Sequence, residues 1–228
     1  MLTLHIANKN YSSWSLRPWV LLTELGVPFE ERMHVFGKGS NWDAFRAFSP
    51  NGRVPCLHDG ATVVWDSLAI CEYLDERYPA WPAEQLARAW ARCAAAEMHA
   101  GFGALRQQCS MSCGQRVRLH ETGPALVADL ARIDELWSEG LHRFGGPFLA
   151  GDRFTAVDAF YAPVVFRIQT YGLKLGAAAM AYAEHLLAQP SMRLWYAEAL
   201  AEPWRDVAHD AEVAAVGTVT ADLRKMHV

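Results

Sequence analysis

The sequence pattern changes at the proline-rich segment 78–82, and this change constrains the fold more than any other feature. Before it, short apolar stretches separated by turn residues predict strands interleaved with helices. After it, apolar residues recur at helical spacing over long stretches. A chain of 228 residues, 52% of them apolar, can bury a substantial core in each part. We therefore predict an α/β domain over residues 1–79 and an all-helical domain over residues 84–228.

The sequence pattern of residues 1–79 predicts the element order βαβ-ββα. Apolar and polar residues alternate at the start as in a strand, and the helix that follows ends at Gly26, which can take a left-handed conformation. Asp59-Gly60 tolerates the positive φ angles of a tight hairpin turn. Residues 36–53 are predicted to be a long polar connection. The predicted strands cover residues 2–6, 29–35, 54–58 and 61–65, and the predicted helices include residues 19–25 and 67–78.

The sequence pattern of residues 84–228 predicts a helical bundle. Thr155 and Asp158 have the spacing of a capping box, and they precede an apolar stretch that is expected to be buried on most sides. Gly145-Gly146-Pro147 ends the helix before it. The predicted helices cover residues 83–111, 126–141, 159–168, 177–188 and 191–201.

Charge and composition exclude several classes of protein. The formal net charge is −4, and basic and acidic residues are interleaved, so the electropositive face that a nucleic-acid-binding protein needs is not expected. The first ten residues lack the apolar stretch of a secretory signal, and no later window is long and apolar enough to span a bilayer. We expect a cytoplasmic protein without a nucleic-acid or membrane partner.

The cysteines suit a reducing compartment. Their number, five, is odd, and Cys56, Cys71 and Cys93 lie in apolar patterns where a free thiol acts as a small hydrophobic side chain. Cys109 and Cys113 are four residues apart with histidines on either side, but this is not the spacing of a zinc site. No metal site is predicted.

Three serines lie where the first strand leads into the first helix, in Tyr11-Ser12-Ser13-Trp14-Ser15. The N-terminus of a helix offers unpaired backbone N–H groups and the positive end of the helix dipole. A hydroxyl placed there can help to hold an anion. Helix capping by serine is the simpler alternative.

A second group of residues surrounds the predicted hairpin. The Val54-Pro55 bond can be cis, which would turn the backbone N–H and C=O of Val54 outward, where an extended peptide can pair with them. Asp66-Ser67 begins the next helix, where a hydroxyl and a backbone N–H can hold a carboxylate while the aspartate faces an amine. A plain turn and a helix cap explain each part separately.

Together these motifs resemble the cytosolic glutathione transferase family over essentially the whole chain. The segment Ser12-Ser13-x-Ser15-x-Arg17 is similar to the zeta class, which includes maleylacetoacetate isomerases, and Arg17-Pro18 is also similar to the plant tau class. The capping box at 155–158 is similar to the motif of the family's helical domain. The resemblance implies a thioredoxin-like N-terminal domain, a homodimer and glutathione as co-substrate.

The resemblance assigns roles to particular residues. It implies that Ser12 activates the thiol, with Ser13 as the close alternative. It further implies that Val54 and Pro55 present backbone to the cysteinyl residue of glutathione. The γ-glutamyl end would contact Asp66 and Ser67, and the glycyl carboxylate would face Arg53 or Lys38. One position departs from the zeta pattern, because Trp14 replaces a cysteine there; this argues against thiol-dependent reductase chemistry and weakens the isomerase assignment.

The expected chemistry follows from the thiol of glutathione. A free cysteine thiol titrates near ~8.5, so only a few per cent is thiolate at neutral pH. A serine donor and a helix N-terminus would stabilise the anion, which then adds to a small apolar electrophile bound between the domains. Glutathione-dependent isomerisation and a non-catalytic binding protein are the two alternatives. Met98, Phe102, Arg106 and Met111 are candidates for the second pocket, but helix geometry does not fix the faces that they take.

Overall fold

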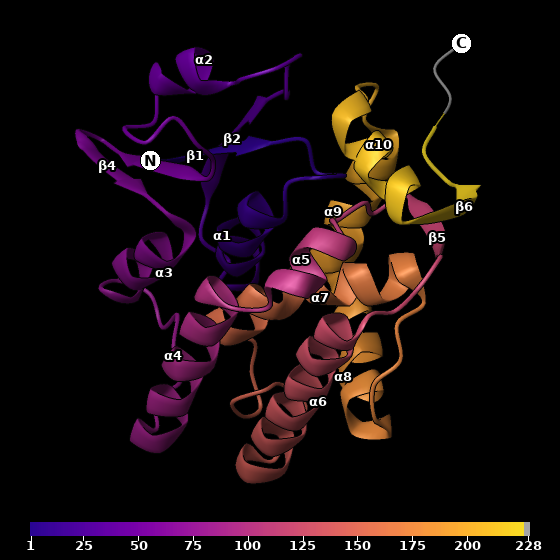
Figure 1. Cartoon of the computed structure of the whole chain (residues 1–228). Helices are drawn as coiled ribbons and strands as arrows, with labels where there is room; N and C mark the ends of the chain where they lie inside the picture. The colour runs from indigo at the N-terminus through magenta and orange to yellow at the C-terminus, as the bar shows by residue number, and fades with distance from the viewer. Residues whose placement is uncertain (226–228) are drawn as a thin grey trace.

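The computed structural model describes residues 1–225 and consists of a four-stranded sheet with helices on both faces and a larger helical part beside it (Figure 1). The strands are β1 (Leu2–Ala7), β2 (Phe29–His34), β3 (Cys56–Asp59) and β4 (Thr62–Trp65), and they lie in the order β2-β1-β3-β4. β1 and β2 run parallel, whereas β3 runs antiparallel to both β1 and β4. The predicted βαβ-ββα order is confirmed.

Helices α1 (Ser13–Glu24) and α3 (Ser67–Asp75) lie on one face of the sheet, and α2 (Trp42–Arg46) lies on the other (Figure 1). The alternation in β1 explains this arrangement. Leu4 and Ile6 are fully buried in the main core, whereas His5 stacks on Phe48, just after α2. The prediction of a connection without a helix over residues 36–53 was wrong, because α2 is a single short turn with only one buried side chain and leaves no helical period in the sequence.

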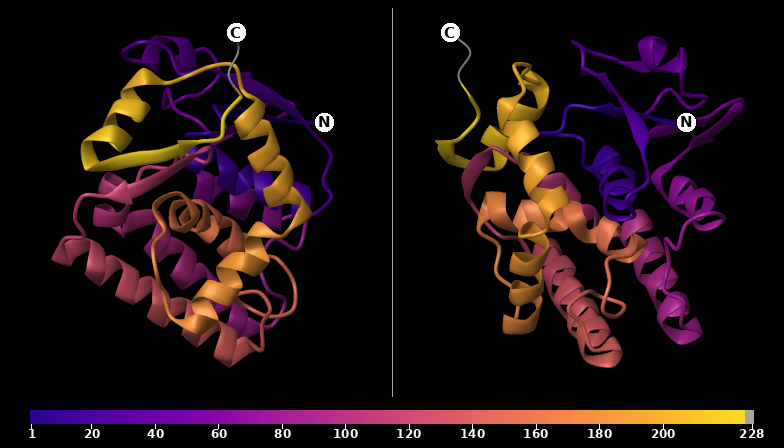
Figure 2. Two further views of the ribbon diagram at one scale, coloured as in Figure 1. Left: turned by 90° about the vertical axis from the view of Figure 1, so that its right-hand side faces the viewer. Right: turned by 180° about the vertical axis from the view of Figure 1, so that it is seen from behind.

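The helical part contains a central helix surrounded by others (Figure 2). This central helix, α7 (Ala156–Tyr171), is buried along nearly its whole length, and the predicted capping box at its start is present. Asp158 accepts the backbone N–H of Thr155 at 2.9 Å and that of Leu149 at 3.0 Å. The helices are α4 (Gln85–Ala100), α5 (Gly103–Gln108), α6 (Pro124–Phe144), α7 (Ala156–Tyr171), α8 (Ala177–Leu187), α9 (Pro190–Ala201) and α10 (Val207–Val216).

The single helix predicted over residues 83–111 was wrong, because the chain breaks between α4 and α5. Gly101 has extended backbone angles and Phe102 has a left-handed φ of 57°. The Arg106 guanidinium donates to the carbonyls of His99 and Gly101 and so satisfies groups at the end of α4. The apolar period continues across the break, which is why the sequence pattern does not show it.

A two-stranded antiparallel sheet, β5 (Gln115–Leu119) with β6 (Gly217–Asp222), was also not predicted. It joins the loop after α5 to the end of the chain beside α10 (Figure 2). Its partners are about a hundred residues apart in sequence, and local patterns carry no information on such a pairing. The predicted domain boundary falls in the segment between α3 and α4.

Candidate active site

The loop between β1 and α1 is held by the helical part. The indole N–H of Trp195 donates to the Lys9 carbonyl at 2.9 Å, and the Glu202 carboxylate accepts the backbone N–H groups of Lys9 and Asn10 at 2.5 and 3.3 Å. Lys9 is buried, and its ammonium pairs with Glu31 at 2.7 Å and with Glu198. These contacts fix the backbone immediately before α1, and therefore the position of its first residues.

Ser12 is the N-cap residue of α1, but its hydroxyl does not cap the helix. It makes no hydrogen bond to the backbone N–H groups of the first turn and instead lies 2.7 Å from the hydroxyl of Ser15. Ser15 is fully buried and accepts the N–H of Ala7 at 3.2 Å. Ser12 is 5% exposed and lines a cavity together with Ser13. The capping alternative for Ser12 therefore has no support in the geometry.

Two cavities meet at this helix N-terminus. The larger has a volume of about 510 Å³ and the smaller about 250 Å³, and Trp14, Arg53 and Val54 line both. The smaller cavity is further lined by Pro55, Asp66 and Ser67. The structure thus brings seven of the eight predicted site residues to two adjoining spaces. Lys38 is exposed and lines neither.

Polar side chains from α3 and α4 line the smaller cavity. The hydroxyl of Ser67 is buried at the start of α3 and has no hydrogen-bond partner among the described residues. Asp66 has a left-handed φ of 74° and caps α3 by accepting the N–H of Leu68 at 2.8 Å. Its other oxygen lies 3.5 Å from Nε2 of His99, which comes from α4. His99 was not predicted as a site residue; only the fold shows that α4 carries it to Asp66.

The larger cavity has a positively charged wall. Arg106 and Arg167 both line it, and their hydrogen bonds within residues 1–225 go to backbone carbonyls. Arg17 lies behind Trp14, with its guanidinium 4.0 Å from the centre of the indole ring, and two of its buried nitrogens have no hydrogen-bond partner in the part of the chain that the structure describes. Burial, together with repulsion from the other two arginines, lowers the pKa of Arg17 to about 9.

Aromatic residues and α10 complete the larger cavity. Gly52 has a left-handed φ, and a side chain there would meet the ring of Trp42 at 2.6 Å, so that position requires glycine. Phe36 and His209 stack at a centroid distance of 5.6 Å. Sequence analysis missed His209, because α10 shows no clear apolar period and buries only Val213.

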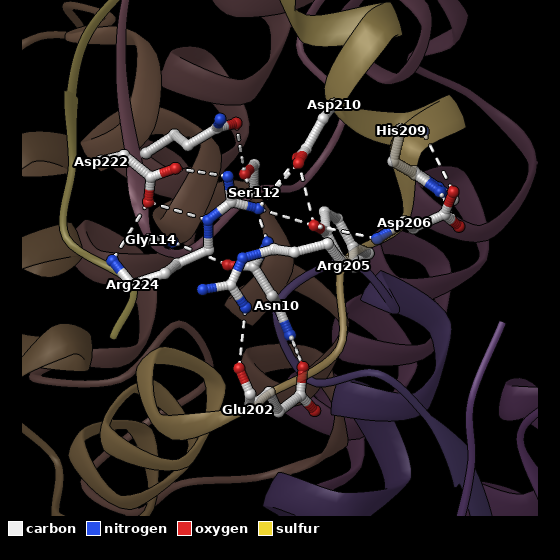
Figure 3. A network of polar contacts seen from close by, with 12 residues as sticks. Asn10, Ser112, Gly114, Glu202, Arg205, Asp206, His209, Asp210, Asp222 and Arg224 are labelled. Atoms are coloured by element: carbon white, nitrogen blue, oxygen red, sulfur yellow. Dashed lines mark hydrogen bonds and ion pairs between the residues drawn. The ribbon is translucent and has the colours of Figure 1, made fainter. Parts of the chain in front are cut away.

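Tyr11 also lines the larger cavity, but its hydroxyl faces the C-terminal segment. It donates to Asp210 at 3.1 Å and accepts hydrogen bonds from the backbone of Asp206 and the guanidinium of Arg224. Figure 3 shows how these three partners lie. Burial raises the pKa of Tyr11 to about 12. Its three partners therefore hold this hydroxyl toward the C-terminal segment.

Within residues 1–225 no group of three or more His, Cys, Asp or Glu side chains is arranged to hold a metal ion. All five cysteines are free; Cys93 is exposed, contrary to the prediction, because it lies on the outer face of α4, and the other four are buried. None of the described helices has the length and apolarity needed to cross a membrane.

The fold and the two cavities define a protein with a thioredoxin-like domain joined to a helical domain, and comparison with known sequences gives its family. A sequence model of the glutathione S-transferase N-terminal domain matches residues 11–77, and one of the C-terminal domain matches residues 83–206. The chain belongs to the glutathione S-transferase family. The predicted family resemblance is confirmed.

Individual relatives match over different lengths. The maleylpyruvate isomerase of a Ralstonia species is 41% identical over 31% of this chain and 36% of its own length. Glutathione S-transferase Z1 of Arabidopsis thaliana is 39% identical over 32% and 36%. The chain thus spans about a third of these relatives. Glutathione S-transferase hmp2 of Hypomyces subiculosus is 25% identical over 68% of this chain and 79% of its own length.

Solved structures share the fold. The tau class glutathione S-transferase of mango has a TM-score of 0.67 at 20% identity and covers 94% of this chain and 97% of its own. A bacterial maleylpyruvate isomerase of the zeta class has a TM-score of 0.65 at 24% identity, with coverage of 85% and 95%. The theta class enzyme of Xanthomonas axonopodis, solved with glutathione bound, has a TM-score of 0.64 at 24% identity, with coverage of 86% and 96%.

Proposed function

We propose that this protein is a glutathione transferase that holds the thiol of glutathione as a thiolate beside Ser12 and adds it to a small electrophile. One observation carries the proposal: the Ser12 hydroxyl lines the cavity at the start of α1 and is not used to cap the helix. The neighbouring N–H groups of the first turn add the positive end of the helix dipole. A sulfur anion placed there would receive both contributions.

The free energy needed to stabilise the thiolate of bound glutathione is modest. Lowering the thiol pKa by two units takes ~2.7 kcal/mol. A hydrogen bond to a charged group contributes about 1.5–3 kcal/mol, and a helix N-terminus about 0.3–1 kcal/mol. The two together reach the required value. Serine acts here as a hydrogen-bond donor, and the sulfur of glutathione is the nucleophile.

Glutathione fits the two cavities in one orientation. The γ-glutamyl end would lie in the smaller cavity, where its carboxylate meets the orphaned hydroxyl of Ser67 and its amine meets Asp66. The cysteinyl backbone would pair with Val54, which precedes the cis peptide bond to Pro55. The thiol then enters the larger cavity beside Ser12. Arg53 lines both spaces and faces the glycyl carboxylate in this orientation.

The test of this proposal removes the hydroxyl of Ser12 and leaves the other contacts of glutathione in place. Ser12→Ala is expected to lower turnover with an aromatic electrophile at least tenfold and to change glutathione affinity little, because the binding contacts lie elsewhere. Ser13→Ala is the matched control, since it removes a hydroxyl from the adjacent residue of the same cavity. Loss of turnover in Ser13→Ala with normal activity in Ser12→Ala would move the role to Ser13.

A second candidate function is glutathione-dependent cis–trans isomerisation of an unsaturated carboxylate, of the maleylacetoacetate type. Arg106 and Arg167 favour it, because they line the electrophile side of the cavity without a carboxylate partner in the described chain. A buried guanidinium is stabilised by an anion. Turnover of maleylacetone, set against turnover of an aromatic electrophile, separates the two functions.

A non-catalytic glutathione-binding protein is the third possibility. It would bind glutathione without lowering the pKa of the thiol, so titration of thiolate absorbance in the complex distinguishes it from both enzymes. A role in detoxification, a homodimeric assembly and a cytoplasmic location stay predictions from the family resemblance and the sequence. Sedimentation tests the assembly, since a 25.4 kDa species would contradict the dimer.

A further inference from the structure

His209 on α10 lines the same cavity as Ser12 and is paired with Asp206. Asp206 is the N-cap of α10, and its Oδ1 accepts the backbone N–H groups of Ala208 and His209 at 3.0 and 3.3 Å. Its Oδ2 lies 2.8 Å from Nδ1 of His209, as Figure 3 shows. Since a carboxylate accepts hydrogen bonds, Nδ1 carries the hydrogen in this pair. The carboxylate therefore fixes both the orientation and the tautomer of the ring.

The second ring nitrogen is left for a ligand. Within residues 1–225 the hydrogen bonds of the His209 ring involve Nδ1 alone, and the ring lines the larger cavity. It stacks on Phe36, with an interplanar angle of 22°, and lies 5.3 Å from the Tyr11 ring. The side chain is 32% exposed, so solvent also reaches it. The imidazole ring is thus held at the wall of the cavity by its Nδ1, and its exposure allows proton exchange with water.

The other ionisable groups near this ring are less suited to proton transfer. The Tyr11 hydroxyl is engaged by Asp210 and Arg224. Glu212 lines the cavity one turn further along α10, and the described structure gives it no partner that fixes its orientation. Imidazole is also the side chain whose ordinary proton exchange falls near neutral pH.

The chemistry of thiol addition shows what such a group would do. When a thiolate adds to an α,β-unsaturated carbonyl compound, a carbon–sulfur bond forms and the electron pair of the C=C bond moves to give an enolate. The enolate must then take one proton to become the product. When a thiolate displaces chloride from a nitroaromatic ring, the chloride leaves with the electron pair and no proton is needed.

We propose that His209, oriented by Asp206, protonates the enolate formed when glutathione adds to an α,β-unsaturated carbonyl compound in the cavity. The proton moves from Nε2 of the imidazolium to the α-carbon, and solvent water returns a proton to the ring. The overall reaction consumes one glutathione and one acceptor and forms one adduct. This inference rests on the proposed transferase function and adds a catalytic residue to it.

The experiment compares two acceptors in one variant. His209→Phe keeps a ring to stack on Phe36 but removes the transferable proton. We expect kcat/KM for 4-phenylbut-3-en-2-one to fall by about 10² or more, as is usual for the loss of a general acid, while kcat/KM for 1-chloro-2,4-dinitrobenzene falls by less than about threefold. Asp206→Asn, which keeps a good N-cap residue, should lower the enone reaction selectively and by a smaller factor.

Rescue by added imidazole tests whether His209 acts through its proton or only through its packing. In His209→Ala, added imidazole should restore part of the enone reaction and leave the chloride displacement unchanged. Equal losses with both acceptors, or no rescue, would reduce His209 to a part of the cavity wall. A selective loss in Glu212→Gln but not in His209→Phe would assign the proton to Glu212 and overturn the inference.

The wild-type protein separates this inference from the proposed function. If it displaces chloride but does not add glutathione to the enone, the inference is wrong and the transferase function stands. If it catalyses neither reaction, the proposed function itself fails before any His209 variant is made, and the inference fails with it.

Discussion

The hydroxyl pair of Ser12 and Ser15 allows a prediction about how the thiol is activated. Ser15 accepts the N–H of Ala7 at 3.2 Å, and its oxygen is 2.7 Å from that of Ser12. A hydroxyl hydrogen rotates to suit its partners. When Ser15 donates to Ser12, the hydrogen of Ser12 is left to donate to a sulfur anion, and the chain of donors strengthens each bond. Ser15 is then a positioning residue one step behind the site.

Ser15→Ala removes this support. One neutral hydrogen bond contributes ~1 kcal/mol, and one pKa unit corresponds to ~1.4 kcal/mol. We therefore expect the pKa of the bound glutathione thiol to rise by about 0.7 units and turnover below that pKa to fall by up to about fivefold. The variant should also lose about 1–3 kcal/mol of stability, because the N–H of fully buried Ala7 is left without a partner.

The assay is a titration of thiolate absorbance in the glutathione complex of each variant. The stability loss alone would indicate a structural role, so the pKa is the deciding measurement. An unchanged thiol pKa in Ser15→Ala, together with the expected drop in urea midpoint, would refute the relay. Ser13→Ala serves as the control, since Ser13 makes no contact with Ser15 in the hydrogen-bond network described above.

Three further predictions concern the fold. Asp158→Asn should destabilise the protein by about 2–4 kcal/mol in urea denaturation, because both carboxylate oxygens accept hydrogen bonds and an amide has only one acceptor. Burial and the neighbouring histidines lower the pKa of His5 to about 4. The unfolded chain therefore binds a proton that the folded chain does not, and stability should fall as the pH drops from 6.5 to 4, with less of a fall in His5→Phe. Arg224→Leu removes the guanidinium that joins Tyr11 to Asp210, so amide hydrogen exchange in α10 should become faster.

The sheet domain and its site residues were predictable because they depend on local signals. The alternation in β1, the turn at Asp59-Gly60 and the cap at Asp66 are each encoded within a few residues, and their order is typical of one family. Seven of the eight predicted site residues therefore line the two cavities. Lys38 lies in a connection without a regular pattern, and nothing local fixes its direction.

The second pocket was not predictable in the same way, because distant segments form it. Arg106 comes from α5, Arg167 from the buried α7 and His209 from α10, and no spacing in the sequence relates them. The break between α4 and α5 also requires a left-handed backbone conformation at Phe102, which a residue other than glycine rarely adopts. The fold brings these residues together. Arg106 was among the four candidates predicted for this pocket, but the sequence could not fix the face that it takes, and nothing in the sequence pattern singled out Arg167 or His209.

Trp14 illustrates how the structure explains a departure from the family pattern. The indole lies where the zeta pattern has cysteine, and it lines both cavities. Its ring is 4.0 Å from the Arg17 guanidinium, 5.6 Å from that of Arg106, and edge-on to His99. A cation near an aromatic face contributes about 0.5–2 kcal/mol, so Trp14 partly offsets the burial of the Arg17 guanidinium, two of whose nitrogens have no hydrogen-bond partner within residues 1–225. A cysteine at this position would remove this packing as well as add a thiol, because the indole forms part of the wall of both cavities.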